Sequence, residues 1–130
     1  RMNKEIQNRT WISARYHSFG YAVRGIIYLF KTQPNAQIHA VAAVLVILLG
    51  FLFHISPLEW ALIAISIGAV ITTELINTAI ESLTDLLSPE IQPKAGFVKD
   101  LAAGAVLVSA IAAGCIGCII FVPKFFEWII

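Results

Sequence analysis

A run of polar side chains between Glu74 and Asp85 holds the residues whose types and spacing best suit chemistry. Counted at about 100° per residue on a helix, Glu74, Asn77, Glu81 and Asp85 fall within a sector about 80° wide, called here the acidic stripe. A carboxylate can act as a general base, and two carboxylates with an amide between them can hold a hard cation such as Mg²⁺. Like charges on one helix face repel unless a cation lies among them. The stripe is therefore a candidate catalytic and metal-binding surface, with a solvated helix end as the alternative.

Basic residues that could receive phosphate groups are also present. Mg²⁺ usually brings nucleotide phosphates with it, and Lys99, Arg24 and Lys31 are available to bind them. Lys99 begins a predicted helix, where a cation opposes the helix dipole. A phosphate-binding role therefore suits it better than helix stabilisation, with a membrane-surface anchor as the alternative. The sequence has no G-x-x-x-x-G-K-[ST] loop and no protein-kinase motif set, so a nucleotide would bind outside these familiar loops.

The composition places these residues in a membrane protein. Of 130 residues, 58% are hydrophobic and only 13% are charged, too few to cover the surface of a soluble domain of this size. The net charge of +1 offers no field for a polyanion. The composition thus excludes a soluble globular domain, a disordered chain and a nucleic-acid binder. We expect one membrane-embedded domain over residues 1–130.

Three apolar windows are long enough to cross a hydrocarbon layer, which takes roughly 20 helical residues. They predict an all-α integral membrane fold with transmembrane helices near 38–55, 58–87 and 99–122, the second including a cytoplasmic extension. Ser56-Pro57 leaves room only for a tight helical hairpin between the first two spans.

Residues 16–33 predict a helix of another kind. Apolar side chains recur along one face from Phe19 to Phe30, while Tyr21 and Arg24 fall on the opposite face. We expect an amphipathic helix lying on the membrane surface. Basic residues are concentrated before the first span, so the positive-inside rule puts the amino terminus in the cytoplasm and the carboxyl terminus outside.

Depth in the membrane separates the candidate functional groups from the remaining polar ones. Glu74 lies 16 residues into the second window, about 24 Å along a helix, near the cytoplasmic edge of the hydrocarbon. A carboxylate there is costly, which makes it a candidate functional group. His39 and His54 are expected to mark span ends rather than to bind ligands. Cys115 and Cys118, inside the third span, are expected to pack rather than to form a redox or metal pair.

The segment Glu74-Leu-Ile-Asn-Thr-Ala-Ile-Glu81 closely resembles the E-x-x-N-[ST]-A-I-E signature of the small prokaryotic lipid kinases, the bacterial diacylglycerol kinase and undecaprenol kinase family. The resemblance extends through Asp85, through Lys99 to Leu107 and through Gly25 to Ala40. It implies a homotrimer of three-span protomers in the bacterial inner membrane, with active sites shared between subunits. It also implies transfer of the γ-phosphoryl group of Mg-ATP to the hydroxyl of a membrane lipid, so the expected ligands are ATP, Mg²⁺ and a lipid alcohol.

The same resemblance implies a role for individual residues. Glu74 would be the catalytic base, and Asn77 would orient it or the phosphate. Glu81 would bind Mg²⁺. The residues that would contact the nucleotide are Tyr21, Glu81, Glu90, Gln92, Lys99 and Asp100. Direct in-line transfer depends more on charge neutralisation than on covalent chemistry, and these residues supply it.

Two positions depart from the family pattern. Gln33 stands where the better-known members carry a second metal-binding glutamate. Its amide oxygen can coordinate Mg²⁺ but brings no charge, so the metal would be held more weakly unless Asp85 or the ATP phosphates compensate. The family's amino-terminal nucleotide-site arginine aligns with Ala14, and the neighbouring Arg15 is the candidate in its place.

The acceptor lipid stays open between diacylglycerol, which would give phosphatidate, and undecaprenol, which would give undecaprenyl phosphate. The Phe30-Lys31 pair and the Phe121-Val-Pro-Lys124 end resemble the undecaprenol-type members somewhat more. The alternative to a kinase is a non-catalytic small membrane bundle, either a lapsed kinase subunit or a transporter-like protein. A transporter would place its ionisable residue near the bilayer midplane rather than at the edge, so an active kinase is the favoured hypothesis.

Overall fold

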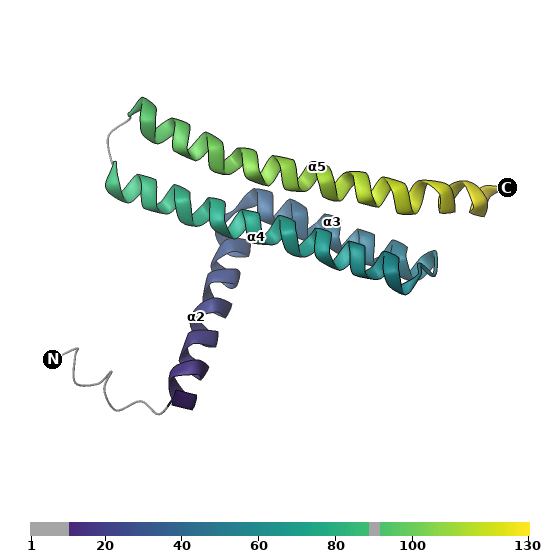
Figure 1. The fold of residues 1–130 in the computed structure, drawn as a ribbon, viewed down its shortest axis with the longest axis horizontal. Helices are drawn as coiled ribbons and strands as arrows, with labels where there is room; N and C mark the ends of the chain where they lie inside the picture. Colours follow the sequence, from purple (N-terminus) through teal and green to yellow (C-terminus); the bar gives the residue numbers. More distant parts are fainter. Residues whose placement is uncertain (1–10, 89–91) are drawn as a thin grey trace.

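The computed structural model describes residues 11–88 and 92–130, and within these two ranges all regular structure is helical (Figure 1). The helices are α2 (Trp11–Thr32), α3 (Pro34–Leu52), α4 (Pro57–Leu87) and α5 (Pro93–Ile129). The last three are long and apolar enough to cross a membrane. The predicted all-α fold with three candidate membrane spans is confirmed at this level.

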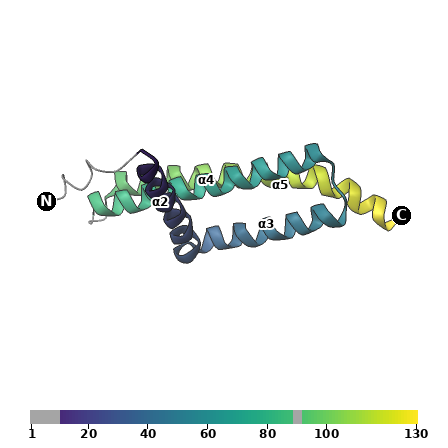
Figure 2. The same ribbon diagram turned by 90° about the horizontal axis from the view of Figure 1, so that it is seen from below.

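A break at Gln33 separates α2 from α3, and α2 turns away from the other helices there (Figures 1 and 2). The cause is Pro34, because a residue before proline is pushed out of the helical region, and Gln33 has φ −108° and ψ 107°. Pro34 then occupies the first turn of α3, where its missing N–H is not needed. Gln37 Nε2 donates to the Phe30 carbonyl oxygen at 2.9 Å across the break. The junction therefore fixes where α3 begins.

A tight turn joins α3 to α4, and we call this the hairpin end of the molecule. Ser56 caps α4: Glu59 N donates to Ser56 Oγ at 3.3 Å, and Ser56 N donates to Glu59 Oε2 at 2.7 Å. Trp60 of α4 packs against Gly50 of α3, where an added Cβ would lie 2.7 Å from the indole ring. The turn and this close approach set how α3 and α4 are aligned.

The partner of α4 over most of its length is α5, which lies alongside it in both views (Figures 1 and 2). The two helices have 31 and 37 residues, about 46 and 55 Å at 1.5 Å per residue, so each extends beyond a hydrocarbon layer about 30 Å thick. At the hairpin end Lys124 Nζ lies 3.2 Å from Glu59 Oε1. α4 ends at Leu87, at what we call the stripe end.

The middle helix of the bundle is α4. In its most apolar window 33% of the residues are buried within the chain, against 11% for the corresponding windows of α3 and α5. α4 contacts each of the other three helices. A polar side chain on α4 can therefore be desolvated by neighbours, whereas one on the outer faces of α3 or α5 cannot.

Candidate active site

The acidic stripe runs along α4 from the interior of the molecule to its exposed end. Glu74 is 2% exposed and Asn77 is 8% exposed. Glu81 is half-buried and Asp85 is exposed. Over 11 residues, about 16 Å of helix, the stripe passes from a desolvated environment to a hydrated one. A buried carboxylate next to a hydrated polar row can meet both a reactant from the apolar phase and a charged one from water.

The most buried member of the stripe faces a histidine. His39 Nε2, on α3, lies 3.4 Å from Glu74 Oε1 on α4. That oxygen is buried and lacks a hydrogen-bond partner among the described residues. Burying a carboxylate is unfavourable unless a partner compensates for lost water. His39 is a described group at a distance from which it could do so.

The next turn of the stripe is held by an internal hydrogen bond. Asn77 Nδ2 donates to Glu81 Oε1 at 3.0 Å. Asn77 Oδ1 is buried and accepts no hydrogen bond within the part of the chain described. Asn77 thus orients the Glu81 carboxylate while keeping one acceptor oxygen of its own available.

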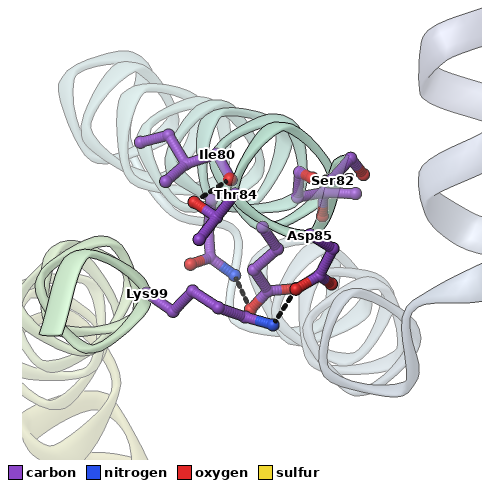
Figure 3. A network of polar contacts seen from close by, with 8 residues as sticks. Ile80, Ser82, Thr84, Asp85 and Lys99 are labelled. Carbon is purple, nitrogen blue, oxygen red and sulfur yellow. Dashed lines mark hydrogen bonds and ion pairs between the residues drawn. The ribbon is translucent and has the colours of Figure 1, made fainter. Parts of the chain in front are cut away.

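At the stripe end a lysine crosses from the neighbouring helix. Figure 3 shows Lys99 extending from α5 to Asp85 on α4, where Nζ donates to Oδ1 at 2.8 Å. The side chains are 36% and 65% exposed, so water and ions reach both. An exposed pair of this kind contributes little to stability, because water screens both charges. It does keep a cation beside the carboxylates.

An apolar cavity of about 440 Å³ lies between α3, α4 and α5. Its walls run from His39, at the level of Glu74, to Phe121 near the hairpin end. Apart from His39, the lining residues with polar side-chain atoms are Ser66 and Cys118. The cavity could hold a hydrocarbon chain or an apolar side chain, and it ends beside the buried carboxylate.

Several predicted site residues lie on α2 or at its end. Tyr21 is exposed on α2, with the Arg24 guanidinium 4.9 Å from its ring centroid. Arg15 is exposed near the start of that helix. Gln33 is half-buried at the break between α2 and α3. None of the hydrogen bonds and ion pairs described for Tyr21 or Gln33 joins them to the acidic stripe.

The remaining predicted site residues belong to the α4–α5 connection and the start of α5. Gln92 is the N-cap of α5, and its side chain makes no capping hydrogen bond. Asp100 is exposed in a groove with Thr73 and Gly104, beside α4 but separate from the Lys99–Asp85 pair. Glu90 lies outside the described residues. Within the described residues of one chain, hydrogen bonds join Asn77 to Glu81 and Lys99 to Asp85. No described hydrogen bond joins Gln92 or Asp100 to the acidic stripe.

His39 is the site residue that sequence reasoning missed, because it was expected only to mark the end of a span. A signal was available. His39 lies 17 residues before Ser56, and Glu74 lies 17 residues after Pro57. Two antiparallel helices joined by a tight turn bring residues equidistant from that turn to the same level, because each rises about 1.5 Å per residue.

The described side chains can be tested for their fit to Mg²⁺. Among residues 11–88 and 92–130, no three His, Cys, Asp or Glu side chains come together as a metal site. Mg²⁺, however, commonly binds through one or two carboxylates together with substrate phosphates. Glu81 offers a carboxylate, and Asn77 Oδ1 is a neighbouring oxygen without a partner in the described chain. These residues fit a magnesium ion that arrives with a nucleotide rather than one held by protein alone.

Fold and site together define a class: a protein whose described residues form helices, with candidate membrane spans and a desolvated carboxylate between an apolar cavity and a hydrated polar row. The family described as prokaryotic diacylglycerol kinase matches residues 20–121. The chain belongs to this family, and this makes it a lipid kinase.

Curated relatives carry two different names. The chain is 43% identical over 117 residues to the undecaprenol kinase of Bacillus subtilis, covering 90% of this chain and 95% of that one. It is 41% identical over 107 residues to the diacylglycerol kinase of Synechocystis, covering 82% of this chain and 61% of that one. It is 25% identical over 118 residues to the diacylglycerol kinase of Escherichia coli, covering 91% and 97%.

Proposed function

We propose that the protein transfers the γ-phosphoryl group of ATP, with Mg²⁺, to the hydroxyl of a membrane lipid, and that Glu74 is the base. The observation that carries this proposal is the state of Glu74. Its carboxylate is 2% exposed, has an oxygen without a hydrogen-bond partner among the described residues, and lies at the level where the apolar cavity ends. A base in that position can reach a hydroxyl whose tail stays in the apolar phase.

In the proposed reaction a Glu74 oxygen takes the hydroxyl proton as the lipid oxygen bonds to the γ-phosphorus. The bond from that phosphorus to the β–γ bridging oxygen breaks, and ADP leaves with that oxygen. Asn77 holds the Glu81 carboxylate in place throughout. Glu81 and Gln33 are the proposed protein ligands of Mg²⁺, which when bound would offset the charge on the phosphates.

The nucleotide is proposed to bind at the hydrated end of the stripe. Lys99 is already held over this region by Asp85 at 2.8 Å, and an exposed ion pair can exchange that carboxylate for a phosphate oxygen at small cost. The other residues proposed to contact ATP are Arg15, Tyr21, Gln33, Glu81, Glu90, Gln92 and Asp100.

The acceptor is proposed to be undecaprenol or diacylglycerol, and we favour undecaprenol. The relative named undecaprenol kinase shares 43% identity over nearly its whole length. The relative named diacylglycerol kinase is 41% identical but is covered over only 61% of its length. The apolar cavity alone does not discriminate, because both lipids present a hydrocarbon chain and a single free hydroxyl.

The chain is proposed to assemble as a homotrimer in the bacterial inner membrane, as one domain with its amino terminus in the cytoplasm. The exposed apolar faces of α3 and α5 offer surface for such contacts as well as for lipid. α2 is proposed to lie on the inner membrane surface, where its tyrosines and basic residues could meet the nucleotide. Light scattering of the protein in detergent would measure the number of copies.

The experiment that tests the function is phosphoryl transfer by purified protein in mixed micelles with ATP and Mg²⁺. Diacylglycerol and undecaprenol are offered in parallel, and Glu74→Gln is the matched control because it keeps the shape of the side chain. We expect labelled lipid with the unsubstituted protein and a loss of about 10²- to 10⁴-fold with the variant. Absence of transfer to either lipid by folded protein would refute the proposal for these acceptors, and Gln33→Glu would then test whether a missing metal ligand is the reason.

A further inference from the structure

The contact between His39 and Glu74 is a feature of the site that the proposed function does not use. His39 is not among the groups assigned to ATP, Mg²⁺ or the acceptor, yet its Nε2 lies 3.4 Å from Oε1 of the buried carboxylate. Its side chain is 26% exposed, while that of Glu74 is 3% exposed. The imidazole therefore contacts the buried carboxylate and is also part of the wall of the apolar cavity.

Other polar side chains of the acidic stripe and of the cavity wall have different partners or lie at a different depth. Asn77, one turn along α4, donates its amide to Glu81. Lys99 is paired with Asp85 at the exposed end of the stripe. The remaining polar residues lining the cavity, Ser66 and Cys118, lie deeper, and the Ser66 hydroxyl donates to the Leu62 carbonyl oxygen at 2.8 Å. The imidazole of His39, with Nε2 3.4 Å from Oε1, is the described basic group in contact with the Glu74 carboxylate.

A free carboxylate side chain can rotate, and a misplaced base loses reactivity steeply. A shift of about 1 Å in a reacting group can cost roughly 100-fold in rate. Hydrogen bonds at active sites are often long before the substrates bind and shorten in the reacting complex, so 3.4 Å is compatible with such a role. One N–H donor on one oxygen fixes the carboxylate plane and leaves lone pairs for the hydroxyl proton.

We propose that His39 is a positioning residue: its Nε2–H donates to Glu74 and holds this carboxylate toward the acceptor hydroxyl. The inference rests on the proposed lipid kinase function with Glu74 as base. The proton from the hydroxyl still passes to Glu74, and His39 remains an N–H donor before and after transfer. In this proposal the turn between α3 and α4 matters for catalysis, because it brings His39 to the same level as Glu74.

The test uses three substitutions at His39 in the full-length protein. His39→Gln places an amide nitrogen close to where Nε2 lies, whereas the shorter His39→Asn does not reach it, and His39→Leu removes the donor altogether. His54→Asn is the control, because it removes the exposed imidazole in the turn between α3 and α4, and Asn tolerates the φ of 49° found there. Circular dichroism and elution volume in detergent establish which variants fold like the unsubstituted protein.

We expect His39→Leu and His39→Asn to lower kcat about 10- to 100-fold, with KM for ATP and for the lipid changed by less than about twofold. His39→Gln should recover most of the loss, and His54→Asn should match the unsubstituted protein. A kcat of His39→Asn equal to that of His39→Gln would overturn the inference, since both are polar and only their reach differs. That comparison stands even if His39→Leu does not fold.

A double-mutant cycle separates an effect through Glu74 from an effect elsewhere. Glu74→Asp retracts the carboxylate, so adding His39→Asn to it should cost much less than His39→Asn alone. Additive losses would overturn the inference. If the unsubstituted protein transfers no phosphate, the proposed function is wrong. If the protein is active and His39 can be replaced without loss of kcat, only the proposed positioning role is wrong.

Discussion

α4 pairs with α5 through a lysine and a carboxylate at each of its ends, and the two pairs differ in their surroundings. At the hairpin end Glu59 lies 3.2 Å from Lys124, and the same carboxylate completes the capping box with Ser56. At the stripe end Asp85 lies 2.8 Å from Lys99 and is 65% exposed. The first pair is part of a closed structural junction, whereas the second is open to water.

The distribution of unpaired polar atoms follows the same division. Buried polar atoms in proteins nearly always have a hydrogen-bond partner. The buried side-chain atoms that lack one among the described residues are Glu74 Oε1, Asn77 Oδ1, Thr78 Oγ1 and Ser109 Oγ. All four belong to the half of the α4–α5 pair toward the stripe end. The comparison teaches that one end of α4 completes its own hydrogen bonds, while the other keeps acceptors that suit ligands.

The largest expected effect comes from removing the negative charge of Glu74 in the acidic stripe. Its counterpart is removal of the negative charge of Glu59 at the hairpin end. Glu74→Gln should lower phosphoryl transfer by about 10²- to 10⁴-fold, because the amide cannot take the hydroxyl proton. It should leave the melting temperature unchanged or raise it, since the variant no longer buries a carboxylate. Glu59→Gln should do the reverse: full activity and a slightly lower melting temperature, because the amide can still accept from Ser56 N but no longer carries the charge that pairs with Lys124.

Rates and thermal unfolding, measured on both variants in one detergent, check this prediction. Equal losses of activity in Glu74→Gln and Glu59→Gln would contradict the functional division between the ends. So would a melting temperature for Glu74→Gln well below that of the unsubstituted protein, because Glu74 would then be a structural residue.

Most of the fold and part of the candidate site could be predicted from the sequence. Apolar windows and Ser56-Pro57 predicted three helical spans with a tight hairpin, because span length and turn chemistry are local properties. The 100° spacing also put the acidic stripe on one face of α4. The 2% exposure of Glu74 was not predictable in this way, since it depends on how closely neighbouring helices pack. To predict that His39 contacts Glu74, the two spans would have had to be aligned through the turn between them.

Other parts of the site depend on more than helix spacing. Equidistance from a turn does not account for the Lys99–Asp85 contact, because Asp85 is two residues before the end of α4 and Lys99 is six residues after the start of α5. Nor does that rule connect Tyr21 or Asp100 to the stripe. Tyr21 lies beyond the break at Gln33, and Asp100 is one residue, or about 100° of helix, away from Lys99. Their proposed roles rest on the resemblance to the family.

A smaller effect is expected from neutralising the two lysines. Lys99→Met should raise KM for ATP about 10- to 100-fold, because it removes the proposed hydrogen bond between two charged groups, the lysine and a phosphate. Lys124→Met should leave KM unchanged and alter stability by less than about 1 kcal/mol. ATP titrations at saturating lipid measure the difference. An equal rise in KM for both variants would show that general charge, rather than the place of Lys99, determines nucleotide binding.

The smallest expected effect tests whether the hairpin end is structural only. Gly50→Ala adds a methyl group 2.7 Å from the ring of Trp60, so the indole must move, and we expect a loss of about 1 kcal/mol of stability. Gly68→Ala on α4 is the matched control, because nothing lies within 4 Å of its added Cβ. Thermal unfolding in one detergent compares them, and kcat should stay near that of the unsubstituted protein in both. A fall in kcat for Gly50→Ala without a fall in melting temperature would mean that the alignment of α3 with α4, and hence of His39 with Glu74, is adjusted from the hairpin end.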